Sequence, residues 1–90
     1  MRLARHFLIS GRVQGVGFRF FVHDAALRDG IHGWVRNLAD GCVEVLAEGE
    51  AEAVERFERQ LRTGPRASRV DEVRVSASAA IGADTGFEIR

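Results

Sequence analysis

The sequence contains no lysine and no tyrosine, so all 13 of its basic residues are arginines. Without lysine, the chain cannot form a Schiff base, use a lysine as a general base, or supply the lysine of an NTPase phosphate-binding loop. The single cysteine, Cys42, has no partner for an internal disulfide, which favours a reducing compartment. These absences exclude several enzyme classes and leave arginine-dependent anion chemistry open.

Metal-binding patterns and membrane signals are also missing from the sequence. His6, His23 and His32 are scattered singly and do not show the spacing of a metal site. No apolar run has the length of a signal-peptide core or of a membrane span. The formal net charge is zero, whereas nucleic-acid-binding domains usually carry a basic excess. We therefore expect a cytoplasmic protein with no metal or cofactor, and with no nucleic-acid or membrane partner.

The apolar pattern predicts one domain over residues 1–90, built from alternating strands and helices. Alternation at every second position favours strands, whereas Phe18, Val22 and Ala25 follow helical spacing. The expected elements are a strand over 3–13, a helix over 18–29, strands over 31–38 and 42–48, a helix between 49 and 64, a strand over 70–76 and a short edge strand over 87–89. Residues 77–85 are expected to form a loop.

This order of elements is typical of the α+β ferredoxin-like βαββαβ sandwich, in which two helices cover one face of a four- to five-stranded, mostly antiparallel sheet. Because a helix joins the first two strands, those strands should run parallel to each other within the sheet. The fold hosts many activities and does not settle the function. Any function must therefore be argued from particular side chains.

The strongest chemical signal is the glycine-rich segment 11–19 (GRVQGVGFR), between the first strand and the first helix. Its glycines allow several backbone N–H groups to turn toward one point, where the unpaired N–H groups of the helix start join them. Arg19 there faces the positive end of the helix dipole, which is unfavourable by roughly 0.3–1 kcal/mol unless an anion lies between them. The segment favours an anion site. The alternative is a simple turn with a solvated Arg19.

Asn37 lies near the end of the second expected strand. Parallel strands place it at the same edge of the sheet as the loop that follows the first strand. Strand alternation groups Gly33, Val35 and Asn37 on one face, and the apolar Val35 indicates that helices cover this face. The Asn37 amide offers a donor and an acceptor, so it can hold a water and a phosphate oxygen together. The alternative is that Asn37 only prepares the turn at 40–41.

Two segments resemble the signatures of the acylphosphatase family: 11–19, and 33–37 (GWVRN). The similarity runs along nearly the whole chain and is weakest over 77–85. It implies an enzyme that hydrolyses small acyl phosphates to a carboxylate and inorganic phosphate, with no metal and no covalent phosphoenzyme. We expect a monomer, although the edge of a small sheet could pair with another chain. The resemblance also implies that Asn37 orients the attacking water. The phosphate-binding loop that the resemblance implies comprises Gln14, Gly15, Val16, Gly17, Phe18 and Arg19.

Two other interpretations stay open at this point. The segment 15–21 echoes the aromatic strand motif of RNA-recognition domains, although that motif belongs on a central strand and here crosses a turn into a helix. The chain also resembles acylphosphatase-like modules within larger carbamoyltransferases, which leaves open a domain that handles carbamoyl phosphate or a binding partner without turnover. No residue pattern identifies the acyl group of the substrate.

Overall fold

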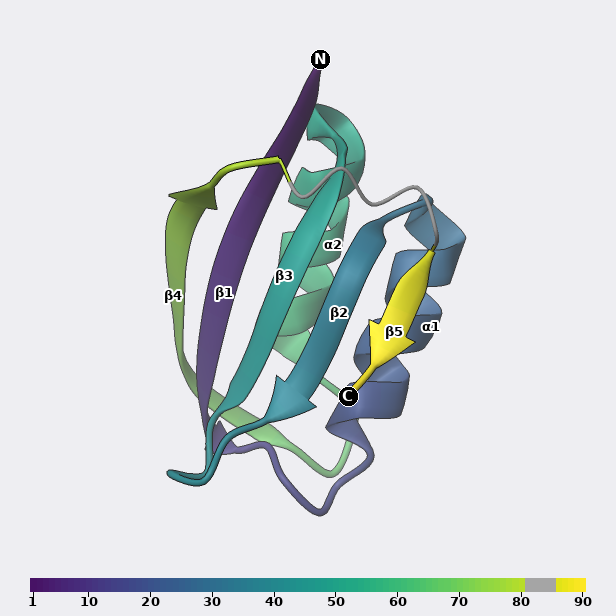
Figure 1. Ribbon diagram of the computed structural model, residues 1–90. Helices are drawn as coiled ribbons and strands as arrows, with labels where there is room; N and C mark the ends of the chain where they lie inside the picture. The colour runs from purple at the N-terminus through teal and green to yellow at the C-terminus, as the bar shows by residue number, and fades with distance from the viewer. Residues whose placement is uncertain (81–85) are drawn as a thin grey trace.

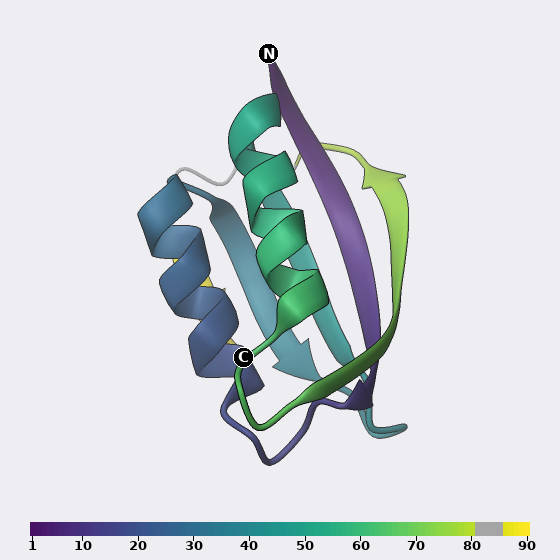
Figure 2. The same ribbon diagram turned by 180° about the vertical axis from the view of Figure 1, so that it is seen from behind.

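The computed structural model describes residues 1–80 and 86–90. Five strands form one sheet in the order β4-β1-β3-β2-β5, and two helices cover one of its faces (Figures 1 and 2). The elements are β1 (Arg2–Arg12), α1 (Phe18–Asp29), β2 (His32–Asn37), β3 (Val43–Glu50), α2 (Ala51–Thr63), β4 (Arg69–Ser78) and β5 (Phe87–Ile89). The predicted ferredoxin-like α+β fold is confirmed.

Strands β1 and β2 both pair antiparallel with β3, which lies between them, and they therefore run parallel to each other. The predicted edge strand is also present, since β5 pairs parallel with β2. The C-terminal ends of β1 and β2 lie at the same edge of the sheet, the lower edge in Figure 1. This edge is where the loop before α1 and the end of β2 come together.

The hydrophobic core lies between the helices and the sheet. The Phe57 side chain of α2 is fully buried and packs edge-on against Phe7 of β1 and Phe87 of β5, with ring centroids 6.2 and 6.0 Å apart. Burying one such ring contributes about 1.5–3 kcal/mol relative to leaving it in water. Phe57 thus holds together a central strand, an edge strand and a helix.

The end of β4 differs from the prediction. Ala77 was expected in a loop, but β4 continues through Ser78, because Ala77 and Ser78 pair with Arg5 and Ala4 of β1. Most β4 side chains are exposed, and a strand that buries few side chains needs no apolar alternation in its sequence. Backbone pairing with β1 is what extends the strand to Ser78. The remainder of the predicted loop includes residues 81–85, which lie outside the described residues. Strand β3 likewise extends to Glu50, two residues beyond its predicted end.

Candidate active site

The loop between β1 and α1 takes its shape from two glycines. Gly15 and Gly17 have φ values of 74° and 76°, in the left-handed region that other residues adopt only at a cost. Gly17 is the N-cap of α1, and no side chain caps this helix start. The first backbone N–H groups of a helix have no intrahelical acceptor. Among the described residues, no side-chain cap accepts a hydrogen bond from them at this helix start. They are available to an anion, which the helix dipole also favours at this end.

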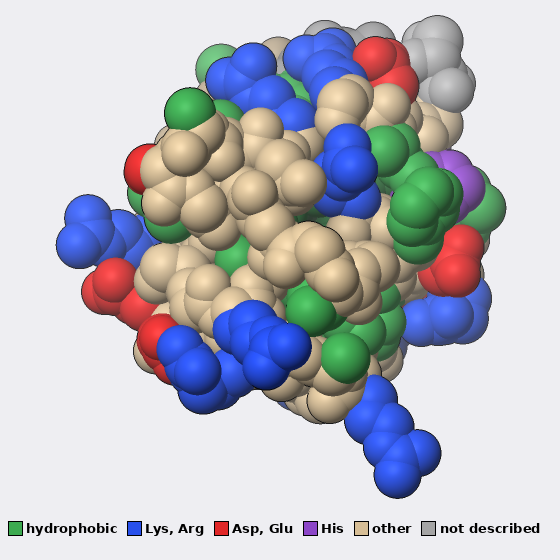
Figure 3. Space-filling view, turned by 90° about the horizontal axis from the view of Figure 1, so that it is seen from below, with side chains coloured by type: hydrophobic (Ala, Val, Ile, Leu, Met, Phe, Trp, Pro, Cys, Tyr) green, Lys and Arg blue, Asp and Glu red, His purple; other side chains and the backbone are tan. Residues whose placement is uncertain are grey.

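The structure brings Arg19 and Asn37 to the same pocket. This pocket has a volume of about 110 Å³ and lies beside the glycine loop. Its lining residues are Val13, Gly15, Gly17, Phe18, Arg19, Phe20 and Asn37. Figure 3 views this end of the molecule, where arginine side chains surround a broad area of exposed backbone and uncharged polar side chains. The meeting of Arg19 and Asn37 follows from the parallel run of β1 and β2, and their chemical roles stay predictions.

Arg19 is partly buried, and its Nη1 donates a hydrogen bond to the main-chain oxygen of Arg90 at 3.2 Å. Among residues 1–80 and 86–90, no Asp or Glu side chain lies within ion-pair distance of Arg19. Within the described residues, the guanidinium is therefore oriented by a main-chain oxygen and forms no ion pair with an Asp or Glu side chain.

Gln14 and Val16 belong to the predicted phosphate-binding loop but do not line the pocket. The Gln14 amide Nε2 donates to the carbonyl oxygens of Leu38 and Cys42, at 2.8 and 2.9 Å. These bonds tie the glycine loop to the turn between β2 and β3. The Val16 side chain packs against the hydrophobic core. Both side chains therefore shape the loop from outside the pocket.

Phe20 is a lining residue that the sequence analysis did not single out. Its place in the first turn of α1, directly after the glycine loop, was the available signal. The segment 15–21 does not form the strand motif of an RNA-recognition domain. It crosses from a loop into α1, and its Phe18 is buried in the core, where it cannot stack on a base.

A family model described as Acylphosphatase matches residues 5–89. The chain belongs to the acylphosphatase family. It is 52% identical to the acylphosphatase of Pseudomonas paraeruginosa, over 99% of this chain and 97% of that protein. The crystal structure of acylphosphatase from Bacillus subtilis superimposes with a TM-score of 0.93 at 38% identity, covering 100% of this chain and 99% of that one. Family and fold identify this chain as an enzyme of the acylphosphatase type.

The chain also matches part of a longer protein. Full-length HypF, whose structure is described as phosphate- and nucleotide-bound, superimposes with a TM-score of 0.89 at 31% identity. The match covers 100% of this chain and 12% of HypF. The acylphosphatase fold therefore occurs both as a chain of about this length and as a segment of a much larger protein.

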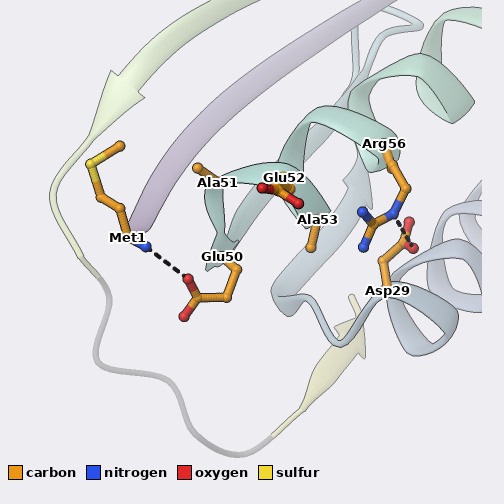
Figure 4. Close-up of a pocket in the computed structure, with 7 residues that line it drawn as sticks. All are labelled: Met1, Asp29, Glu50, Ala51, Glu52, Ala53 and Arg56. Carbon is orange, nitrogen blue, oxygen red and sulfur yellow. Dashed lines mark hydrogen bonds and ion pairs between the residues drawn. The ribbon is translucent and has the colours of Figure 1, made fainter.

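A larger pocket, of about 570 Å³, lies at the opposite end of the sheet (Figure 4). Four of its charged groups form two ion pairs: the Met1 amino nitrogen lies 3.0 Å from Glu50 Oε2, and Arg56 Nε lies 3.3 Å from Asp29 Oδ1. It is lined by Met1, Asp29, Glu50, Ala51, Glu52, Ala53 and Arg56. Paired charges offer little attraction to an anion, so size does not make this pocket the site of a phosphate reaction.

The uncovered face of the sheet carries an ionic cluster that is separate from the pocket. Glu44 lies 2.7 Å from His6 Nε2 and also accepts a hydrogen bond from Arg36. Burial alone would raise the pKa of Glu44, but the hydrogen bonds from His6 and Arg36 outweigh burial and hold it below its ordinary value. Arg36 is thereby engaged on the face of β2 opposite Asn37.

Cys42 is not placed as a nucleophile. Burial raises the pKa of its thiol, and the neighbouring Asp40 raises it further. A thiol with a raised pKa is largely protonated at neutral pH and reacts slowly. Within the described part of the chain, no three His, Cys, Asp or Glu side chains gather closely enough to hold a metal ion. None of the described helices has the length and apolar character needed to cross a membrane.

Proposed function

We propose that this chain hydrolyses the carboxyl–phosphate anhydride of small acyl phosphates by direct attack of water on phosphorus. Arg19 and the backbone N–H groups around Gly15 and Gly17 hold the phosphoryl group, and Asn37 positions the water. The observation that carries the proposal is the shared pocket of about 110 Å³, in which an oriented guanidinium, an amide side chain and a glycine-rich helix start meet. Membership of the acylphosphatase family supports the same reaction.

The residues of the pocket suit this reaction because it needs no general acid. The leaving group is a carboxylate whose conjugate acid has a pKa of about 4, so it departs without protonation at neutral pH. What remains is to position the water and to stabilise negative charge on the equatorial oxygens of a loose transition state. A guanidinium can bind two of those oxygens at once, and backbone N–H groups can bind others.

The attacking water oxygen forms a bond to phosphorus while the bond from phosphorus to the carboxylate oxygen breaks. The Asn37 amide can accept a hydrogen bond from the water through its oxygen and donate one to a phosphate oxygen through its nitrogen. One water proton passes to a phosphate oxygen or to solvent. None of the described residues that line the pocket carries a hydroxyl, thiol, imidazole or carboxylate. Direct hydrolysis therefore fits this lining better than a covalent phosphoenzyme.

We further propose that the enzyme needs no metal, consists of one domain over residues 1–90, and acts as a monomer in the cytoplasm. Its substrates and products are small acyl phosphates, carboxylates and inorganic phosphate, and it has no nucleic-acid partner. The neutral net charge supports this last point, because binding a phosphate backbone broadly requires a basic excess.

The test is to follow the loss of benzoyl phosphate absorbance in EDTA with wild type, Arg19→Ala, Arg19→Lys and Asn37→Ala. Removing one donor to a developing oxyanion costs about 3–4 kcal/mol, so each alanine variant should lose roughly 10²- to 10³-fold in kcat. Lysine keeps the charge but not the planar pair of donors, so Arg19→Lys should recover little activity. Arg28→Ala, at the far end of α1, is the matched control.

Circular dichroism must show that each variant is folded. Wild-type hydrolysis in EDTA that disappears in the Arg19 and Asn37 variants and persists in Arg28→Ala supports the proposal. A folded wild type without turnover would overturn it and would favour a binding module, for which titration with carbamoyl phosphate is the next measurement.

A further inference from the structure

Phe20 combines strong exposure with a place at the candidate active site. Its side chain is 64% exposed, although phenylalanine is an apolar residue on a helix. Single exposed apolar residues are common on protein surfaces and need no explanation by themselves. Phe20 differs because it lines the same pocket as Arg19 and Asn37. Among the described residues, Phe18, Phe21 and His23 are the α1 residues whose rings contact another aromatic ring, and the Phe20 ring makes no such contact.

The pocket has a volume of about 110 Å³. When the phosphoryl group is held by Arg19 and the glycine loop, as proposed, the acyl group lies against the remaining lining residues. Two other apolar side chains of the lining, Val13 and Phe18, are 1% and 2% exposed and offer little surface to it. Phe20 is thus the exposed apolar side chain that this lining offers to an acyl group. Figure 3 shows hydrophobic side chains exposed beside arginines at this end of the molecule.

We infer that Phe20 selects acyl phosphates with an aromatic or bulky apolar acyl group, by packing its ring against that group at the rim of the pocket. This inference rests on the proposed function. An aromatic acyl group can lie against the Phe20 ring in an offset or edge-on arrangement and remove apolar surface from water. The methyl group of acetyl phosphate is too small to cover the ring. Selectivity between the two substrates then depends on Phe20 and not on the phosphate contacts.

The contact with the acyl group exists both before and during the reaction, since the bond that breaks lies on the phosphate side. An interaction of equal strength in ground and transition states changes KM and leaves kcat unchanged. Loss of the Phe20 ring should therefore raise KM for an aromatic substrate alone. This kinetic pattern separates Phe20 from Arg19 and Asn37, whose loss should reduce kcat.

The experiment compares benzoyl phosphate with acetyl phosphate in wild type, Phe20→Ala and Leu27→Ala. Leu27 is a matched control because it is 58% exposed on the same helix and does not line the pocket. Seven residues separate the two, so Leu27 lies on a similar side of α1, roughly 10 Å further along it. In Phe20→Ala we expect KM for benzoyl phosphate to rise about five- to tenfold, the effect of one lost aromatic contact. Acetyl phosphate kinetics, and inhibition by inorganic phosphate, should stay within about twofold of wild type.

A selectivity ratio that is unchanged in Phe20→Ala would overturn the inference while leaving the proposed function intact. Equal losses on both substrates, together with weaker phosphate inhibition, would also overturn it, because they would show that Phe20 only supports the start of α1. Absence of turnover on both substrates by wild type would instead overturn the proposed function, and the inference with it.

Discussion

The side-chain amide of Gln14 donates a hydrogen bond to the carbonyl oxygen of Leu38 at 2.8 Å. Gln14 directly precedes the glycine loop, and Leu38 directly follows Asn37. A second bond from the same nitrogen reaches the carbonyl oxygen of Cys42 at 2.9 Å. Gln14 therefore fixes the separation between the two chain segments that carry the candidate functional groups.

The first prediction concerns this link. Gln14→Ala should lose about 1–3 kcal/mol of unfolding free energy, because two partly buried carbonyls lose their side-chain donor. It should also lose about tenfold in kcat/KM, because catalysis by positioning is sensitive to shifts of about 1 Å. Urea unfolding and benzoyl phosphate kinetics measure the two effects.

Gln14→Glu is the sharper variant of the same test. An ionised carboxylate has no donor and would face two carbonyl oxygens, so at neutral pH it should be more damaging than alanine. Acidification should relieve part of this effect, since a protonated carboxyl can donate one hydrogen bond. Wild-type turnover in both variants would show that the loop holds its position without Gln14.

A second prediction uses two glycines that cap the same helix. Gly17 is the N-cap and Gly30 the C-cap of α1, with φ values of 76° and 66°. An added Cβ at either position would meet nothing within 4 Å. Alanine at either position should therefore cost about 1–2 kcal/mol of stability through backbone strain alone. Gly17→Ala should in addition reduce kcat/KM, because Gly17 orients the N–H groups beside Arg19, whereas Gly30→Ala should not. Equal activities at matched stability would argue against a catalytic role for the loop conformation.

The third prediction is a pH dependence of stability. Since the pKa of Glu44 is lowered in the folded protein, its hydrogen bonds with His6 and Arg36 stabilise the fold above the ordinary glutamate pKa of 4.5. This contribution is lost as the pH falls from 4.5 through the lower folded-state pKa. Glu44→Gln should therefore be less stable than wild type at pH 7, and the difference should shrink toward pH 3. Denaturant unfolding at both pH values tests this, and a difference that does not depend on pH would contradict it.

The fourth prediction concerns the core. Phe57→Ala should cost about 3–5 kcal/mol, because it removes a fully buried ring that contacts Phe7 and Phe87. Such a loss is a large part of the 5–15 kcal/mol that usually stabilises a domain. Phe20→Ala, which removes the same ring from an exposed position, should change stability by no more than about 0.5 kcal/mol. Thermal unfolding of the two variants gives the comparison, and similar losses would show that the core tolerates the cavity at Phe57.

Much of the fold was predictable because its elements have regular apolar periods. Val22 and Ala25 follow the helical period and are buried in α1, as expected. The prediction was wrong at the end of β4, where Ala77 and Ser78 are held by pairing with β1 and not by burial of their side chains. An edge strand that buries little apolar surface leaves a weak pattern in the sequence.

The candidate site was predictable to a similar degree. Arg19 and Asn37 could be placed at one edge because a helix connection forces β1 and β2 to run parallel. The partners of Gln14 could not be foreseen, since both acceptors are backbone carbonyls, and every residue carries the same carbonyl group. The sequence likewise could not show that Phe20 lies at the rim of a pocket of about 110 Å³.

The types of the elements, the need for glycine before α1 and the resemblance to the acylphosphatases could all be read from the sequence. These features depend on local steric limits and on periods that can be read along the chain. Three relationships required the folded structure: Gln14 binds the turn after Asn37, the Arg19 guanidinium contacts Arg90, and the Phe20 ring is exposed beside the pocket. Those relationships join residues far apart in the sequence, and the packing of α1 against the sheet sets their distances.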